Sequence, residues 1–167
     1  GLGDVYKRQV DDVIALRNKY YPSVKISVLS NSTMIDRPAV AEALLKVDNN
    51  ILKLDSAVDA TMRLIDRPAN KEFTVEHVVG YLKKFRHQCI VQTMMVRGEH
   101  DGVRIDNTTD AEIQALLKAY LEIEPAEVML YSLDRPTPEQ RLQKVERDEL
   151  ERIAEVFRQK GIEVQVN

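Results

Sequence analysis

Cysteine is almost absent from this 167-residue sequence: Cys89 stands alone, so no disulfide can form within the chain. Glycine is sparse as well, with six residues spread singly and no glycine-rich phosphate-binding loop. Tryptophan is missing, and no uncharged apolar run approaches the roughly 20 residues that a membrane-spanning helix needs. These absences exclude a disulfide-stapled scaffold and argue against a phosphate-loop nucleotide site and a membrane span.

A charge excess is also missing. The sequence has 24 Lys and Arg against 27 Asp and Glu, interspersed, for a formal net charge of −3. Nucleic acids and anionic membranes bind basic patches, so neither is predicted as a partner. No signal peptide opens the sequence, and we expect a cytoplasmic location. The histidines His77, His87 and His100 lack ligand-like spacing, so no metal site is predicted.

Four apolar runs end abruptly in polar residues, which is typical of buried strands that deliver side chains to one edge of a sheet. They cover residues 24–31, 51–56, 89–98 and 128–134. Predicted helices lie between them, and a final alternating strand covers 162–166. This α(βα)₄β alternation predicts right-handed βαβ units and a parallel sheet. The length allows either a partial (βα) TIM-type barrel or an open sheet of five strands.

Helix boundaries are predicted from capping patterns. Asp36-Arg37-Pro38 indicates a helix start, because the fixed φ of proline suits the first turn. Capping-box spacing occurs at Ser56 with Asp59 and at Thr109 with Glu112.

The second half contains two further boundary signals. Residues 98–102, Gly-Glu-His-Asp-Gly, are expected to break the third strand. Thr137-Pro138-Glu139-Gln140 is a helix-start pattern, and the last helix is predicted at 145–160 with Gly161 as its C-cap.

The first nine residues stand apart from the rest. Gly1-Leu-Gly-Asp-Val-Tyr-Lys-Arg-Gln9 shows no apolar period that continues into the helix pattern after Gln9, and it resembles a translated sequencing-adaptor string. We therefore interpret residues 1–9 as a non-native segment and residues 10–167 as one incomplete domain. On this interpretation the native chain enters at about Val10, within a helix.

The strand endings together resemble the later strands of radical S-adenosylmethionine (radical SAM) proteins. The resemblance is carried by Val28-Leu-Ser-Asn-Ser-Thr33, Leu52-Lys-Leu-Asp-Ser56, Gln92-Thr-Met-Met-Val-Arg-Gly98 and Met129-Leu-Tyr-Ser-Leu-Asp-Arg-Pro136. It covers residues 10–167 and is closest to the branch around the molybdenum-cofactor biosynthesis A protein and related iron–sulfur oxidoreductases. It implies a partial TIM-type barrel whose first strands are missing.

The same resemblance implies the function of a longer parent protein. Such enzymes reductively cleave S-adenosylmethionine at a [4Fe–4S] cluster to start radical chemistry, here on an unknown substrate, and a flavodoxin or ferredoxin is a possible electron donor. The family's Cys-x-x-x-Cys-x-x-Cys loop and Gly-Gly-Glu-like segment are absent from this sequence. Because the cluster needs three thiolates, we expect this chain alone to be inactive, and we interpret Cys89 as a buried structural thiol.

Six residues are predicted to bind the cofactor: Ser30, Asn31, Lys53, Asp55, Gln92 and Tyr131. Ser30 and Asn31 stand where the family often has Thr-Asn-Gly beside the cofactor, with Ser32 in place of the glycine. Asn31 has a second interpretation, as the cap of a turn. No catalytic residue is assigned.

Lys53-Leu54-Asp55 matches a segment that in the family often reads Ser-Leu-Asp and hydrogen-bonds the ribose or carboxylate of S-adenosylmethionine. Strand alternation places Lys53 and Asp55 on one face and Leu52 and Leu54 on the other. Two charges on an inward face either bind a ligand or pair with each other. A non-catalytic α/β binding domain with a ligand site at the strand ends therefore stays open as an alternative function.

Overall fold

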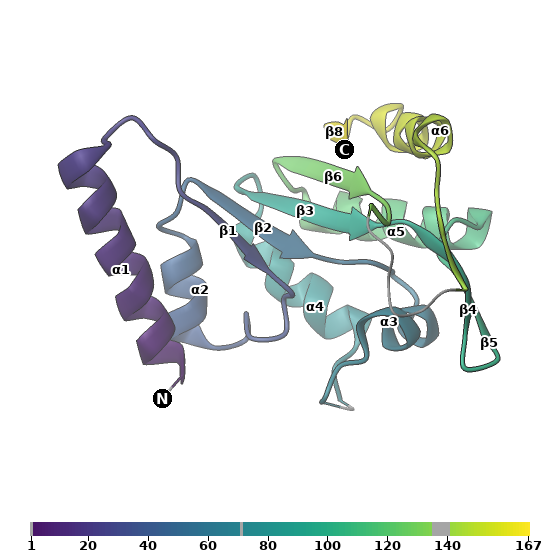
Figure 1. The fold of residues 1–167 in the computed structure, drawn as a ribbon, viewed down its shortest axis with the longest axis horizontal. Coiled ribbons are helices and arrows are strands. Elements are labelled where there is room, and N and C mark those ends of the chain that lie inside the picture. Colours follow the sequence, from purple (N-terminus) through teal and green to yellow (C-terminus); the bar gives the residue numbers. More distant parts are fainter. Residues whose placement is uncertain (1, 71, 135–140) are drawn as a thin grey trace.

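The computed structural model describes residues 2–70, 72–134 and 141–167. At its centre is a five-stranded sheet in the order β1-β2-β3-β6-β8, in which every neighbouring pair is parallel. The strands are β1 (Ser27–Ser30), β2 (Asn49–Lys53), β3 (Cys89–Met94), β6 (Glu127–Tyr131) and β8 (Val164–Val166). The predicted parallel sheet of alternating strands and helices is confirmed (Figure 1).

Helices connect the strands and cover the sheet. They are α1 (Leu2–Tyr20), α2 (Pro38–Leu44), α3 (Asp59–Asp66), α4 (Val75–Leu82) with the short 3-10 helix η1 (Lys83–Phe85), α5 (Asp110–Ile123) and α6 (Arg147–Arg158). The main core joins buried residues of α2, α4, α5 and α6 to the strands, whereas α1 packs on the outer side of α2 (Figure 1).

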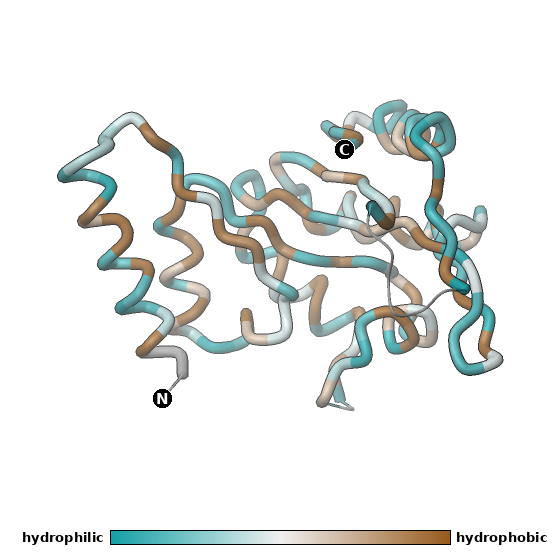
Figure 2. The backbone as a smooth tube through the Cα atoms, viewed as in Figure 1, coloured by the Kyte–Doolittle hydropathy of each residue, from teal (hydrophilic) through white to brown (hydrophobic). Residues whose placement is uncertain are grey.

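The two faces of the central sheet differ. Leu52, Val91 and Val128 have no exposed surface and lie in the core with the helices. Their sequence neighbours Lys53 and Gln92 point to the other face and stay partly exposed. Figure 2 shows the resulting recurrence of hydrophobic residues along the central strands. The sheet thus has a helix-covered face and an open face. Some of the predicted site residues lie on one face and some on the other.

The capping predictions succeed at two helices and fail at one. Arg37 is the N-cap of α2 with Pro38 in its first turn, and Thr109 is the N-cap of α5, whose side chain accepts from the Glu112 backbone N–H. The reciprocal half of the Thr109 capping box is not formed, because the Glu112 carboxylate accepts from Ser56 and Thr61. The capping box predicted at Ser56 is wrong, because α3 begins at Asp59 with Val58 as its N-cap. The Ser56 hydroxyl instead donates a hydrogen bond of 2.6 Å to the buried carboxylate of Glu112 and so links this loop to α5.

A second, antiparallel sheet was not predicted. It has the order β5-β4-β7, formed by β4 (Val96–His100), β5 (Val103–Asp106) and β7 (Leu142–Lys144). The prediction that residues 98–102 break a strand is wrong at its first residue, since Gly98 lies inside β4 and the turn falls at Asp101 and Gly102, whose φ angles are 49° and 77°. The hairpin lies at the carboxyl ends of the central strands (Figure 1).

The last helix also differs from its prediction. It begins at Arg147 because the Val145 N–H donates to Ser132 Oγ and Glu146, in an extended conformation, is the N-cap, while its end before Gly161 agrees with the predicted C-cap region. The predicted helix-start pattern at 137–140 lies outside the described residues.

Gly98 should be essential to the small sheet. Its φ of 139° is unfavourable for other residues, and a Cβ there would collide with the carbonyl oxygen of Arg141 and lie 2.8 Å from Cα of Leu142. We expect Gly98→Ala to lower the free energy of unfolding by about 1–3 kcal/mol from backbone strain, and more through lost pairing of β7.

Urea denaturation of the Gly98→Ala variant measures this loss. Gly102→Ala is the matched control, since its φ is 77° but no atom lies within 4 Å of the added Cβ. Equal losses for the two variants would contradict the clash.

The segment interpreted as non-native is part of α1. The helix runs without a break from Leu2, Tyr6 packs against the core, and Lys7 Nζ lies 2.8 Å from a carboxylate oxygen of Glu42. The non-native origin of residues 1–9 and the domain boundary at Val10 stay predictions.

β1 forms an edge of the central sheet. Within the described residues it pairs with β2 alone, and Leu29 on it is 65% exposed. No helix in the described part of the chain is long and apolar enough to cross a membrane.

Candidate functional site

An ion pair lies at the carboxyl end of β2. Lys53 Nζ is 2.7 Å from Oδ2 of Asp55 and 3.4 Å from Oδ1 of Asp66, which closes α3. The Asp55 side chain has no exposed surface, whereas 28% of the Lys53 side chain is exposed. Lys53 therefore covers Asp55, and of these two charged groups only Lys53 is open to a ligand.

Backbone contacts fix Asp55 in place. Asp55 Oδ1 accepts from the Met94 N–H at 2.9 Å. Asn107 Nδ2 donates to the carbonyl oxygens of Asp55 and Met94, each at 2.7 Å, and Asn107 Oδ1 accepts from the Val96 N–H at 2.7 Å. Asn107 thus joins the ends of β2 and β3 to the start of β4. Sequence reasoning missed this role, and the only signal was an asparagine beside a capping box.

Burial and pairing act in opposite directions on the two charges. Burial raises the pKa of Asp55 to about 7, although the nearby Lys53 ammonium lowers it. Burial alone would lower the pKa of Lys53, but the Asp55 carboxylate raises it above its ordinary value. The shift of Lys53 requires an ionised Asp55, so the charged pair exists above the pKa of Asp55, and protonation of Asp55 removes it.

Gln92 and Tyr131 join Lys53 on the open face. Lys53 is in register with Gln92, and Met94 with Tyr131, and partners in register on parallel strands share a face. Gln92 Nε2 reaches Sδ of Met129 at 3.6 Å, a weak contact that leaves the amide available. Burial and then the Asp55 carboxylate raise the pKa of Tyr131, so its hydroxyl stays a hydrogen-bond donor at neutral pH. The structure thus brings Lys53, Asp55, Gln92 and Tyr131 together.

Ser30 is not part of this group. It is in register with Leu52, so it lies on the helix-covered face, and its Oγ accepts from the Ser32 N–H at 3.2 Å. Asn31 Oδ1 accepts from the backbone N–H of Thr33 at 3.1 Å and from its hydroxyl at 2.7 Å. The second interpretation of Asn31, as the cap of a turn, therefore describes its local contacts. A cofactor-binding role for Ser30 and Asn31 stays a prediction.

Ser32 has the backbone of a glycine. Its φ is 64°, in the left-handed region that glycine adopts at little cost. This geometry gives a physical reason for the glycine that the resembling family often has at this position.

The residues of this chain do not fit a [4Fe–4S] cluster. Cys89 is the only cysteine in the sequence and has no exposed surface, and burial raises the pKa of its thiol to about 12. No three His, Cys, Asp or Glu side chains are grouped to hold a metal ion within the described ranges. Three thiolates for a cluster would have to come from residues outside this chain.

Comparison with known proteins gives two curated relatives. No protein-family model matches the sequence. A "UPF0026 protein" of Helicobacter pylori strain 26695 is 25% identical over 121 residues, and its counterpart in strain J99 is 22% identical over 120 residues. Each alignment covers 71% of this chain and 37% of the relative. The chain therefore spans little more than a third of the length of these relatives.

Solved structures decide the fold type. A radical SAM methyltransferase from Sphaerobacter thermophilus matches with a TM-score of 0.63 and 19% identity, over 85% of this chain and 40% of that protein. A domain of pyruvate-formate lyase-activating enzyme from Bacteroides vulgatus matches with a TM-score of 0.68 and 10% identity, over 100% of this chain and 94% of that domain. Streptococcus suis SuiB matches with a TM-score of 0.64 and 12% identity, over 94% of this chain and 35% of SuiB. The chain has a radical SAM-type fold.

Proposed function

We propose that this chain is part of a radical SAM enzyme and that its open sheet face binds S-adenosylmethionine. The observation that carries the proposal is the partly exposed Lys53 side chain, whose ammonium pairs with the buried Asp55 at the carboxyl edge of a parallel sheet. Ligands of open α/β sheets bind at this edge. The likeness to solved radical SAM structures supports the cofactor class.

Each open-face residue has a distinct part in this proposal. Lys53 pairs with the carboxylate of the cofactor, and Gln92 and Tyr131 offer hydrogen bonds to its ribose or amino-acid portion. Asp55 is a positioning residue, because its buried carboxylate reaches a ligand only through Lys53. Bound at a [4Fe–4S] cluster, S-adenosylmethionine supplies the carbon radical with which such enzymes act on substrates.

The finer assignment is also part of the proposal. The strand endings favour the branch of the molybdenum-cofactor biosynthesis A protein and related iron–sulfur oxidoreductases, with an electron donor such as flavodoxin or ferredoxin. The cluster ligands come from outside this chain, since it has one buried cysteine. The chain alone is then inactive, and the open edge of β1 pairs with strands of the longer protein.

Recovery of the complete reading frame tests this proposal. We expect a Cys-x-x-x-Cys-x-x-Cys motif within about 100 residues before Val10. Its absence would favour the alternative of a non-catalytic α/β binding domain. Calorimetric titration of the complete protein with S-adenosylmethionine then separates a binding site from a mere likeness of fold.

Asp55→Ala should weaken that binding in the complete protein. Loss of the charge that holds Lys53 removes about 1–3 kcal/mol of charge-assisted hydrogen bonding, or about 5- to 150-fold in affinity. Calorimetry measures the change, and circular dichroism confirms that the variant is folded. The matched control is Glu127→Gln, which removes a carboxylate from the first position of β6, at the amino end of the strands. Equal affinities for Asp55→Ala and the unaltered protein would remove the ion pair from the site.

A further inference from the structure

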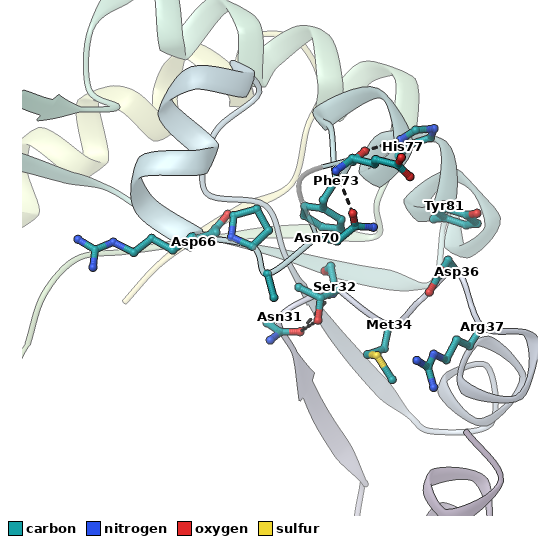
Figure 3. Close-up of a pocket in the computed structure, with 15 residues that line it drawn as sticks. Asn31, Ser32, Met34, Asp36, Arg37, Asp66, Asn70, Phe73, His77 and Tyr81 are labelled. Carbon is teal, nitrogen blue, oxygen red and sulfur yellow. Dashed lines mark hydrogen bonds between the residues drawn. The ribbon is translucent and has the colours of Figure 1, made fainter. Parts of the chain in front are cut away.

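A cavity of 570 Å³ lies between two loops, one after β1 and one joining α3 to α4 (Figure 3). Its wall includes Ser32, Arg37 and Asn70 from these loops and Tyr81 from α4. Small-molecule sites in proteins commonly have volumes of about 300–1,000 Å³. The cavity therefore has the size of a ligand site, and its lining includes neither Lys53 nor Tyr131 of the open face.

Ser32 supplies an unsatisfied polar group to this cavity. Ser32 is 1% exposed, and its Oγ has no hydrogen-bond partner in the described part of the chain. A buried hydroxyl without a partner is costly, so such groups are usually satisfied by another molecule. The residue also keeps a left-handed φ of 64° that serine rarely adopts. A ligand that accepts a hydrogen bond would satisfy the hydroxyl.

Further donors lie around the same cavity. Asn31 Oδ1 is occupied by Thr33, and Asn70 Oδ1 accepts from the Glu72 N–H at 2.9 Å. Asn31 Oδ1 accepts two hydrogen bonds and Asn70 Oδ1 one, so the NH₂ groups of both side chains remain as donors. Arg37 adds a guanidinium that makes no ion pair in the described part of the chain, and Figure 3 shows it beside Met34 at the cavity wall. Amide donors together with a guanidinium match a carboxylate.

Apolar surface completes the cavity. Met34, Phe73 and Tyr81 line it and are each partly buried. We propose that this cavity binds a small carboxylic acid that carries an apolar or aromatic group. The inference goes beyond the proposed function and does not rest on it. Three carboxylates of the lining would favour a cation instead, so the test has to compare both charges: Asp36 and Glu72 are exposed, and Asp66 is half-buried and pairs with Lys53.

Three small probes with the same ring decide the ligand class. The 167-residue chain, labelled with ¹⁵N, is titrated with 3-phenylpropionate, its neutral amide and phenethylamine. We expect 3-phenylpropionate to shift the backbone signals of Asn31, Ser32 and Asn70 and to bind at least tenfold more tightly than the other two. Equal binding of acid and amide, tighter binding of the amine, or no shift of these signals would each overturn the proposal.

Variants locate the site. Arg37→Gln should lower the affinity for 3-phenylpropionate at least tenfold, because the positive charge is lost. Ser32→Gly should lower this affinity several-fold, because the hydroxyl is lost. Glycine accepts the φ of residue 32, so Ser32→Gly preserves the loop. The matched control is Lys25→Gln, which removes one positive charge two residues before β1, at the opposite end of that strand. Unchanged binding to Arg37→Gln, or an equal loss in Lys25→Gln, would reject the assignment to this cavity.

Discussion

Asn107→Ala is expected to lower the free energy of unfolding by about 3–5 kcal/mol. The substitution leaves the Val96 N–H without its acceptor and the carbonyl oxygens of Asp55 and Met94 without the amide that joins them. The Asn107 side chain has no exposed surface, so water does not readily replace it. Each buried polar group left unsatisfied costs about 1–3 kcal/mol. Urea denaturation followed by circular dichroism measures the loss.

Asn49→Ala is the matched control for this variant. Its Nδ2 donates to Ser27 Oγ at 3.0 Å in an exposed contact at the other end of β2, where water can take over. We expect a loss below about 0.5 kcal/mol there. A loss below about 1 kcal/mol for Asn107→Ala would show that the network does not join the strand ends. The Asn107→Ala substitution should also displace Asp55, because Asn107 donates a hydrogen bond to the Asp55 carbonyl oxygen.

The alternation of strands and helices was predictable because its signals are local. Apolar runs ended by polar residues correctly placed the central strands, and Pro38 and Thr109 marked helix starts through contacts within one turn. The antiparallel sheet was missed for the opposite reason. Val96 continues the apolar run of β3, and Gly98 in β4 pairs with Leu142, a residue far along the chain. The pairing of β4 with β7 leaves no local pattern in the sequence. The β4–β5 hairpin does leave one, the two-residue turn Asp101-Gly102 between His100 and Val103, and this signal was overlooked.

The candidate site was predictable to a similar extent. Strand alternation correctly placed Lys53 and Asp55 together and left pairing between them as an alternative, which is the contact that the structure has. Asp66 and Asn107 reach the pair from a helix end and a loop, so no strand pattern could point to them. Ser30 lies apart from this group, since its register with Leu52 puts it on the helix-covered face.

Lys53→Met should be destabilising in a pH-dependent way. Removal of one partner leaves the buried Asp55 carboxylate uncompensated, which costs about 3–5 kcal/mol where Asp55 is ionised. The pKa of Asp55 is already raised to about 7 in the folded protein, so its folded state holds the proton more tightly than the unfolded chain. Stability linked to Asp55 is therefore fully present below its ordinary pKa and is lost as pH rises through the folded pKa. The Lys53 ammonium lowers the folded pKa, so its removal raises that pKa further and deepens the loss at high pH.

Urea denaturation at pH 5 and pH 8 separates this effect from lost packing. Below the folded pKa of Asp55, at pH 5, its carboxyl is mainly protonated, so Lys53→Met should be close to the unaltered protein in stability. Above that pKa the deficit should grow by at most about 1.4 kcal/mol per pH unit, because the variant can still keep the proton that the unaltered protein has lost, and it should be clearly present at pH 8. The double variant Lys53→Met/Asp55→Asn is the control, because asparagine keeps an oxygen for the Met94 N–H and carries no charge. We expect it to recover most of the loss at pH 8 and to lack the pH dependence. A deficit of equal size at both pH values would mean that Lys53 acts through its aliphatic stem and not through Asp55.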